Sequence, residues 1–225
     1  MKNTNLTMLS LLLILTLGLP HAQAEEPKTR GEDGDVLTPL TIGNTWVYED
    51  MDNSFITTDR IEGVVLFDGH PWHLLRSYEH EAGRPANTAE LVSDNFWLTL
   101  KDGYEWDAWA ELNGGDDDEE FVAEELQLTS LSRYYRYPAT LGETYKPNAD
   151  DQTVVMTVTS LSEKITTKAG EFDCIVYKET STEDEDYAFT SWVAPGVGII
   201  KNAGTDEDGE PYGSALVSYT LVEED

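Results

Sequence analysis

The chain is poor in cysteine and in basic residues. Cys174 is its only cysteine, so no internal disulfide can form and stability must come from packing. The 14 Lys and Arg residues stand against 44 Asp and Glu residues, and the formal net charge is −30. A surface with such an excess of negative charge repels phosphate groups. Nucleic acid and anionic membranes are therefore not expected as partners.

The sequence also has none of the motifs that mark common catalytic sites. It contains no G-x-S-x-G, no H-E-x-x-H and no phosphate-binding glycine loop. His70 falls in a turn, and His73 and His80 follow on a strand-like segment where alternate residues face opposite sides, so the three do not converge as zinc ligands must. Cys174 lies in a strand-like run and is interpreted as a small buried hydrophobe. We expect no catalytic residue, no metal and no cofactor.

Acidic residues gather in four short segments between apolar stretches. These segments are Glu32–Asp35, Asp116–Glu120, Glu183–Asp186 and Asp206–Glu210. None of them matches the ligand spacing and central glycine of a calcium-binding EF-hand loop. Their interpretation is that of solvated loops that maintain solubility, with calcium binding left open as the alternative.

Only one long apolar run is present, and it lies at the N-terminus. Lys2 precedes the run Leu6–Leu19, and an A-x-A cleavage site follows at Ala22–Ala24. The run is shorter than the roughly 20 residues that a membrane-spanning helix needs. We therefore predict that residues 1–24 are a bacterial signal peptide, and that the mature protein is periplasmic or secreted without stable membrane insertion. No cysteine lies directly after the cleavage site, which argues against a lipid-anchored lipoprotein.

The mature chain shows the two-residue period of β-strands. A polar, acidic leader over residues 25–37 is expected to be flexible. Beyond it, Tyr104, Trp106 and Ala108 alternate with acidic residues, which predicts a strand with its aromatic face inside and its acidic face in solvent. About ten such strands are separated by glycine-containing turns. Helix signals are weak, and Glu119–Leu131 is the one candidate.

An internal repeat stands out within the β-rich region. Pro39–Trp46 and Pro138–Tyr145 both read P-x-T-[I/L]-G-x-T-[W/Y]. Each octamer is followed by a strand, a glycine turn and, later, a tryptophan-bearing strand, at Trp97 and at Trp192. The proline favours an extended entry, and the glycine permits a positive φ before the aromatic residue.

This repeat sets the expected domain organisation. Residues 38–225 form one mainly β domain, a single curved antiparallel sheet or an open β-barrel, with half-repeats at about 38–137 and 138–225. We predict that Gly43 and Gly142 share a backbone conformation and that the two octamers enter the sheet in the same way.

Motifs of the second half resemble a group of exported bacterial proteins of unknown function. The segments Ala169–Cys174 and Trp192–Lys201 carry this resemblance most specifically, after Tyr137–Tyr145 and before a closing strand at Leu216–Tyr219. The barrel-like domain of that group is distantly similar to the lipoprotein-carrier (LolA/LolB-like) fold. The resemblance implies a curved sheet around an apolar concavity and brings no catalytic residues with it.

Three classes of function follow from these observations. A non-catalytic envelope binding module, holding an apolar small molecule or a protein segment, requires an interior cavity lined by aromatic residues. A structural or assembly factor that docks a partner envelope protein requires a filled interior and an exposed apolar patch or free edge strand. An enzyme without a recognisable motif requires a cleft with clustered, perturbed titratable groups. The first is favoured, with Tyr104, Trp106 and Trp192 as candidate ligand-binding residues, although core packing also explains them.

Overall fold

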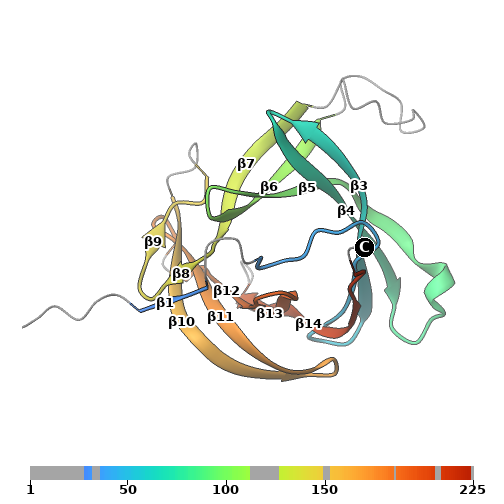
Figure 1. The fold of residues 1–225 in the computed structure, drawn as a ribbon. Helices are drawn as coiled ribbons and strands as arrows, with labels where there is room; N and C mark the ends of the chain where they lie inside the picture. The colour runs from blue at the N-terminus through green and yellow to red at the C-terminus, as the bar shows by residue number, and fades with distance from the viewer. Residues whose placement is uncertain are drawn as a thin grey trace, which may run out of the picture.

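The computed structural model describes residues 28–31, 36–111, 127–148, 153–184, 186–205 and 209–223. The predicted signal peptide and the acidic segment Asp116–Glu120 lie outside these ranges. One large antiparallel sheet forms the protein, with its twelve strands in the order β7-β6-β5-β4-β3-β2-β14-β13-β12-β11-β10-β9 (Figure 1).

The strands alternate with short turns along the chain. Their bounds are β2 (Thr45–Asp50), β3 (Phe55–Phe67), β4 (His70–Glu81), β5 (Glu90–Lys101), β6 (Tyr104–Glu111), β7 (Gln127–Arg136), β9 (Thr144–Tyr145), β10 (Val154–Thr167), β11 (Gly170–Ser181), β12 (Ala188–Ala194), β13 (Gly198–Thr205) and β14 (Pro211–Thr220). A second, two-stranded sheet pairs β1 (Thr29–Arg30) with β8 (Ala139–Thr140). Within the described ranges the single helical element is a 3-10 turn, η1 (Ala86–Thr88).

These elements confirm the mainly β class and the curved antiparallel sheet. The weak helix candidate is wrong over its described part, because Gln127–Leu131 belongs to strand β7. Pairing with β6 along Gln127–Arg136 outweighs the weak local helix signal. Among the described residues, no helix has the length and apolar character needed to cross a membrane.

The sheet consists of two six-stranded meanders, β2–β7 and β9–β14, that meet where β14 pairs with β2. Three of the six pairs of strands at matching places have equal lengths: β4 and β11 each have 12 residues, β6 and β13 each have 8, and β7 and β14 each have 10. The other pairs differ, most strongly β2 with 6 residues against β9 with 2, and β5 with 12 against β12 with 7. Trp97 and Trp192, which the repeat aligned, lie on the fourth strand of their respective meanders.

The two octamers make the same backbone hydrogen bonds. Gly43 N donates to Ile61 O at 2.8 Å, and Gly142 N donates to Val158 O at 2.9 Å. Ile61 N and Val158 N in turn donate to the residues after these glycines, at 3.0 and 2.9 Å. Gly43 has φ 95° and Gly142 has φ 79°, so the predicted shared conformation is confirmed. Ile61 and Val158 are both 0% exposed, so each octamer anchors its strand to the core.

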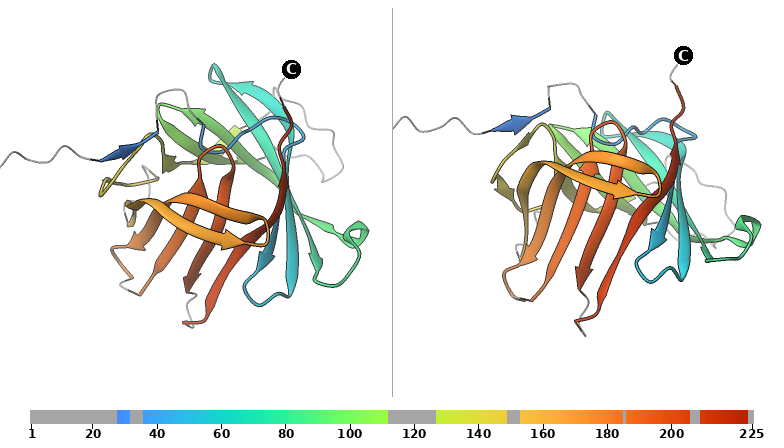
Figure 2. Two further views of the ribbon diagram at one scale, coloured as in Figure 1. Left: turned by 60° about the horizontal axis from the view of Figure 1, so that its bottom comes forward. Right: turned by 90° about the horizontal axis from the view of Figure 1, so that it is seen from below.

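The sheet curls until its two edges come near each other, without a continuous ladder between them. Arg133 N, on β7, donates to Pro147 O at 2.8 Å, and an isolated bridge pairs Ser132 with Asn148. Figure 2 shows the second meander as a curved layer of orange and red strands, with the long β10–β11 hairpin bent across it.

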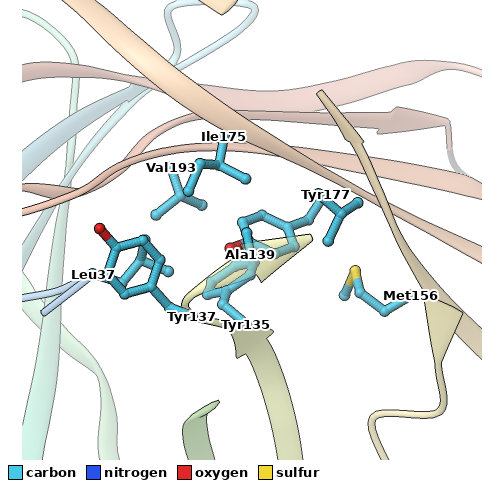
Figure 3. Close-up of a cluster of buried hydrophobic side chains, with 9 residues drawn as sticks. Leu37, Tyr135, Tyr137, Ala139, Met156, Ile175, Tyr177 and Val193 are labelled. Carbon is cyan, nitrogen blue, oxygen red and sulfur yellow. The ribbon is translucent and has the colours of Figure 1, made fainter. Parts of the chain in front are cut away.

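Two apolar clusters fill most of the space that the curled sheet surrounds. Figure 3 shows the first, where Tyr135, Tyr177 and Val193 pack with Leu37 of the leader. The second gathers Trp46, Tyr48 and Ile61 of the first meander against Ile200 and Leu216 of the second, with Leu40, Leu98, Cys174 and Ala194. Leu37 is 1% exposed, and Gly196 N donates to its carbonyl oxygen at 3.0 Å. Leu37, Thr38 and Leu40 are therefore packed inside the fold, ahead of the first long strand.

Candidate functional site

The interior is not completely filled. A cavity of about 370 Å³ lies between strands β2–β7 of the first meander and strands β12 and β13 of the second. This volume lies in the range typical of small-molecule sites. Its lining residues are Thr38, Trp46, Tyr48, Asp59, Leu75, Phe96, Leu98, Glu105, Asp107, Tyr134, Tyr135, Phe189, Ile199 and Asn202. Aromatic and aliphatic side chains make most of this wall, and three carboxyl groups interrupt it.

Strand β6 contributes acidic residues to the cavity because its two faces lie opposite to the prediction. Glu105 and Asp107 line the cavity, whereas Trp106 packs against a separate apolar cluster with Trp72 and Ala108. The expectation that the acidic face of this strand is in solvent is wrong for Glu105, which is 5% exposed. Trp106 is covered on the other side of the sheet, so alternation alone did not identify the inner face.

Glu105 is the most isolated of the three acids. Its Oε2 atom is buried and makes no hydrogen bond within the described structure. Burial raises the pKa of Glu105 to about 7, and the nearby Thr38 hydroxyl opposes this rise, although no hydrogen bond of ordinary geometry joins the two groups. An uncompensated buried carboxylate is costly, so the carboxyl is partly protonated at neutral pH.

Asp107 and Asp59 have perturbed ionisation for the same reason. Burial, reinforced by the negative charge of Glu105, raises the pKa of Asp107 to about 7. Burial raises the pKa of Asp59 to about 6, and a hydrogen bond from Ser77 Oγ, at 2.6 Å from Oδ1, limits the rise. The three carboxyl groups therefore all titrate between about pH 6 and pH 7, well above surface carboxylates.

A fourth acid, Glu179 of β11, is held next to this group by tyrosines. The hydroxyl of Tyr134 donates to Glu179 Oε2 at 3.2 Å, and that of Tyr187 donates to Oε1. Burial first, and then the charges of Glu179 and Asp107, raise the pKa of Tyr134 far above its usual value. Tyr134 therefore stays protonated and links Glu179 to the cavity wall.

The three residues chosen from sequence do not meet at this cavity. Tyr104 lies at a smaller cavity of about 220 Å³, beneath the guanidinium carbons of Arg136 and Arg133 at 4.9 and 5.5 Å from its ring centre. Trp106 donates its indole N–H to Lys101 O at 3.0 Å.

Trp192 is held by charged groups of the second meander. Its indole N–H donates to Glu163 Oε1 at 2.9 Å, and Lys201 Nζ lies 5.0 Å from its ring centre. Ligand binding by Tyr104, Trp106 and Trp192 stays a prediction.

Sequence reasoning missed the residues that line the cavity. Glu105 and Asp107 were assigned to solvent, and Asp59 and Tyr48 were not singled out. The sequence of strand β6 contained one signal for these residues. Its aromatic side chains alternate with acids, and a strand of this kind can be packed on both faces, which would bury the acids as well.

The structure also shows the surroundings of Cys174 and His73, which the sequence analysis discussed. Cys174 is 0% exposed, and burial raises the pKa of its thiol to about 12, which confirms the buried hydrophobe. His73 is half-buried, and burial lowers its pKa. In the described part of the chain, no group of three His, Cys, Asp or Glu side chains is placed to hold a metal ion.

Two solved structures are similar to this fold. One is a candidate exported protein with a YmcC-like fold from Bacteroides fragilis, at 14% identity and a TM-score of 0.50, covering 83% of this chain and 100% of that chain. The other is a candidate lipoprotein from Parabacteroides distasonis, at 13% identity and a TM-score of 0.49, covering 84% of this chain and 100% of that chain. At such identities the likeness concerns the fold alone. No protein-family model matches the chain, and no curated protein matches it.

Proposed function

We propose that this protein is an exported, non-catalytic binding module that holds one small, largely apolar molecule inside its curled sheet. The cavity of about 370 Å³ carries the proposal, because its wall is mostly aromatic and aliphatic. An assembly factor would be expected to have a filled interior, and the cavity therefore favours a small ligand over a docked protein.

Export is supported by two independent observations. The predicted signal peptide of residues 1–24 has the positive start, short apolar run and A-x-A site of a secretory leader. The similar Bacteroides fragilis structure is described as an exported protein.

A second candidate, an enzyme that uses carboxyl groups for acid–base chemistry, is favoured by the clustered acids. Asp59, Glu105 and Asp107 have raised pKa values in one cavity, which is a common property of catalytic sites. The rest of the wall is mostly aromatic and aliphatic, which suits an apolar ligand. Binding is preferred for this reason, and recovery of an unchanged ligand after prolonged incubation would separate the two candidates.

The binding proposal can be tested with a neutral apolar fluorophore, N-phenyl-1-naphthylamine, and the chain from residue 25 onward. We expect saturable binding of the fluorophore to the wild type. We expect at least a tenfold loss of affinity in Leu75→Trp, because the indole ring is larger than the leucine side chain and takes up space in the cavity. Leu66→Trp is the matched control, because Leu66 is 77% exposed and does not line the cavity.

Thermal unfolding checks that both variants fold. If Leu75→Trp does not fold, Ile199→Trp makes the same test from strand β13. A folded cavity variant that binds the fluorophore as tightly as Leu66→Trp does would contradict the proposal, and so would a wild type that does not bind it.

A further inference from the structure

We infer that the molecule held in this cavity is an organic cation: an apolar body that carries a positively charged nitrogen, which the carboxyl groups of Glu105 and Asp107 receive. This inference rests on the proposed binding function and adds the chemical class of the ligand. Four features of the described structure support it.

The first feature is the sign of the charge around the cavity. Its wall contains Asp59, Glu105 and Asp107 and no Lys, Arg or His. Among the described residues, no ion pair involves any of these three acids. The acids therefore have no positive partner from the protein itself, while an anionic ligand would be repelled.

The second feature is the unsatisfied oxygen of Glu105. Ser77 donates to Asp59, and Tyr134 and Tyr187 donate to Glu179, but Glu105 Oε2 is buried with no hydrogen-bond partner in the described structure. Buried polar atoms of this kind are uncommon, and a ligand that brings an N–H donor or a positive charge would compensate the carboxylate.

The third feature is the aromatic wall. Trp46, Tyr48 and Tyr135 come from the strands on one side of the cavity, and Phe189 comes from β12. Ring faces attract cations as well as apolar groups, so one wall serves both parts of an amphiphilic cation.

The fourth feature is the formal net charge of −30, which concentrates cations at the surface of the protein.

Ionisation of the acids gives the cation site a pH dependence. The titratable groups that face Glu105 and Asp107 are Tyr48 of β2, Asp59 of β3, Tyr134 and Tyr135 of β7, and Tyr177 and Glu179 of β11. None of these groups carries a positive charge, so a bound cation must displace protons from the acids. Because the pKa values of Glu105 and Asp107 are both about 7, affinity for a cation rises as the pH increases from 5 to 8.

A matched set of ligands tests the inference: decylamine, decanol and decanoate, each titrated calorimetrically below its micellar concentration. At pH 8 we expect decylamine to bind at least tenfold more tightly than decanol, and decanoate to bind most weakly. The preference for the amine over the alcohol should shrink at least fivefold at pH 5.

Substitution of the acids locates the effect. Glu105→Gln, which keeps the shape of the side chain, should remove most of the preference for decylamine over decanol. Asp107→Asn provides the same test if the first variant does not fold. Glu171→Gln is the control, since Glu171 is an exposed acid of β11 paired with Lys164, and it should bind all three ligands as the wild type does.

The outcomes separate this inference from the function on which it rests. Equal binding of decylamine and decanol to the wild type at both pH values overturns the cation inference while the binding function stands, and so does a preference for decylamine that Glu105→Gln leaves unchanged. Failure of all three ligands and of the fluorophore overturns both.

Discussion

At the scale of single residues, Glu105 is buried because of its place on strand β6, although an acidic side chain favours solvent. Its neighbours on β6 include Trp106, which packs on the other face of the sheet against Trp72. The strand therefore places a carboxyl group, rather than an indole, in the cavity. The folded protein accepts this unfavourable burial mainly by keeping Glu105 protonated up to about pH 7.

Burial of Glu105 predicts that the protein is more stable at mildly acidic pH than at pH 8. Its pKa rises from 4.5 to about 7 on folding, so the folded state binds the proton more tightly and stability falls as the pH rises through this interval. At about 1.4 kcal/mol per pKa unit, the loss is at most about 3 kcal/mol. Glu105→Gln should raise the free energy of unfolding at pH 8 by about 1–3 kcal/mol and change it little at pH 5.

Urea unfolding between pH 5 and pH 8 measures this effect. Glu171→Gln, which removes an exposed acid instead, should keep the slope of stability against pH that the wild type has. Parallel slopes for wild type and Glu105→Gln would show that Glu105 does not titrate in this range.

At the scale of the elements, the two octamers are turns of one design. In both, the backbone N–H of a glycine with positive φ donates a hydrogen bond to the carbonyl oxygen of a buried residue, Ile61 or Val158, just before the chain enters its meander. The second turn is open, with no atom within 4 Å of a Cβ built on Gly142, whereas a Cβ on Gly43 lies 3.1 Å from Val222 Cγ2.

Valine at either octamer glycine should destabilise the protein because a β-branched residue is strained at positive φ. We expect Gly142→Val to lower the free energy of unfolding by about 1–3 kcal/mol, and Gly43→Val to lower it slightly more because of Val222. Gly63→Val is the matched control, since Gly63 lies within β3 without positive φ and a Cβ there is 3.7 Å from Leu74 Cβ. A loss at Gly63 as large as that at Gly142, in chemical denaturation, would argue against conformational strain as the cause.

At the scale of the whole molecule, charge opposes the compact state. The chain carries 44 acidic side chains, and the described ion pairs occupy only a few of them, such as Glu62, Glu143 and Asp173. Most acids therefore repel one another across a folded surface much smaller than that of the unfolded chain.

Salt should stabilise the protein by screening this repulsion. The screening length falls from about 30 Å at 0.01 M to about 4 Å near 0.5 M salt. We expect the thermal midpoint at pH 8 to rise by several degrees between these sodium chloride concentrations. A midpoint that does not change with sodium chloride would show that the acids lie too far apart to repel one another.

The sequence by itself determined the type of the elements and the entry to each half of the sheet. The two-residue period of hydrophobicity is a local property of the chain, so the strands and the buried Cys174 followed from it. The shared octamer predicted a shared backbone conformation for Gly43 and Gly142, and both have a positive φ, which glycine adopts without strain. The half-repeat boundaries and the signal peptide stay predictions.

Only the tertiary structure decided which face of each strand is inside. Alternation on β6 is equally consistent with either face, and the choice depends on Trp72 and Ala108 covering Trp106 from one side while the second meander encloses Glu105 from the other. The cavity likewise joins Tyr48 of the first meander to Ile199 of the second, and no local pattern relates strands so far apart. Its acids titrate near neutrality because the curled sheet buries them and removes part of their hydration.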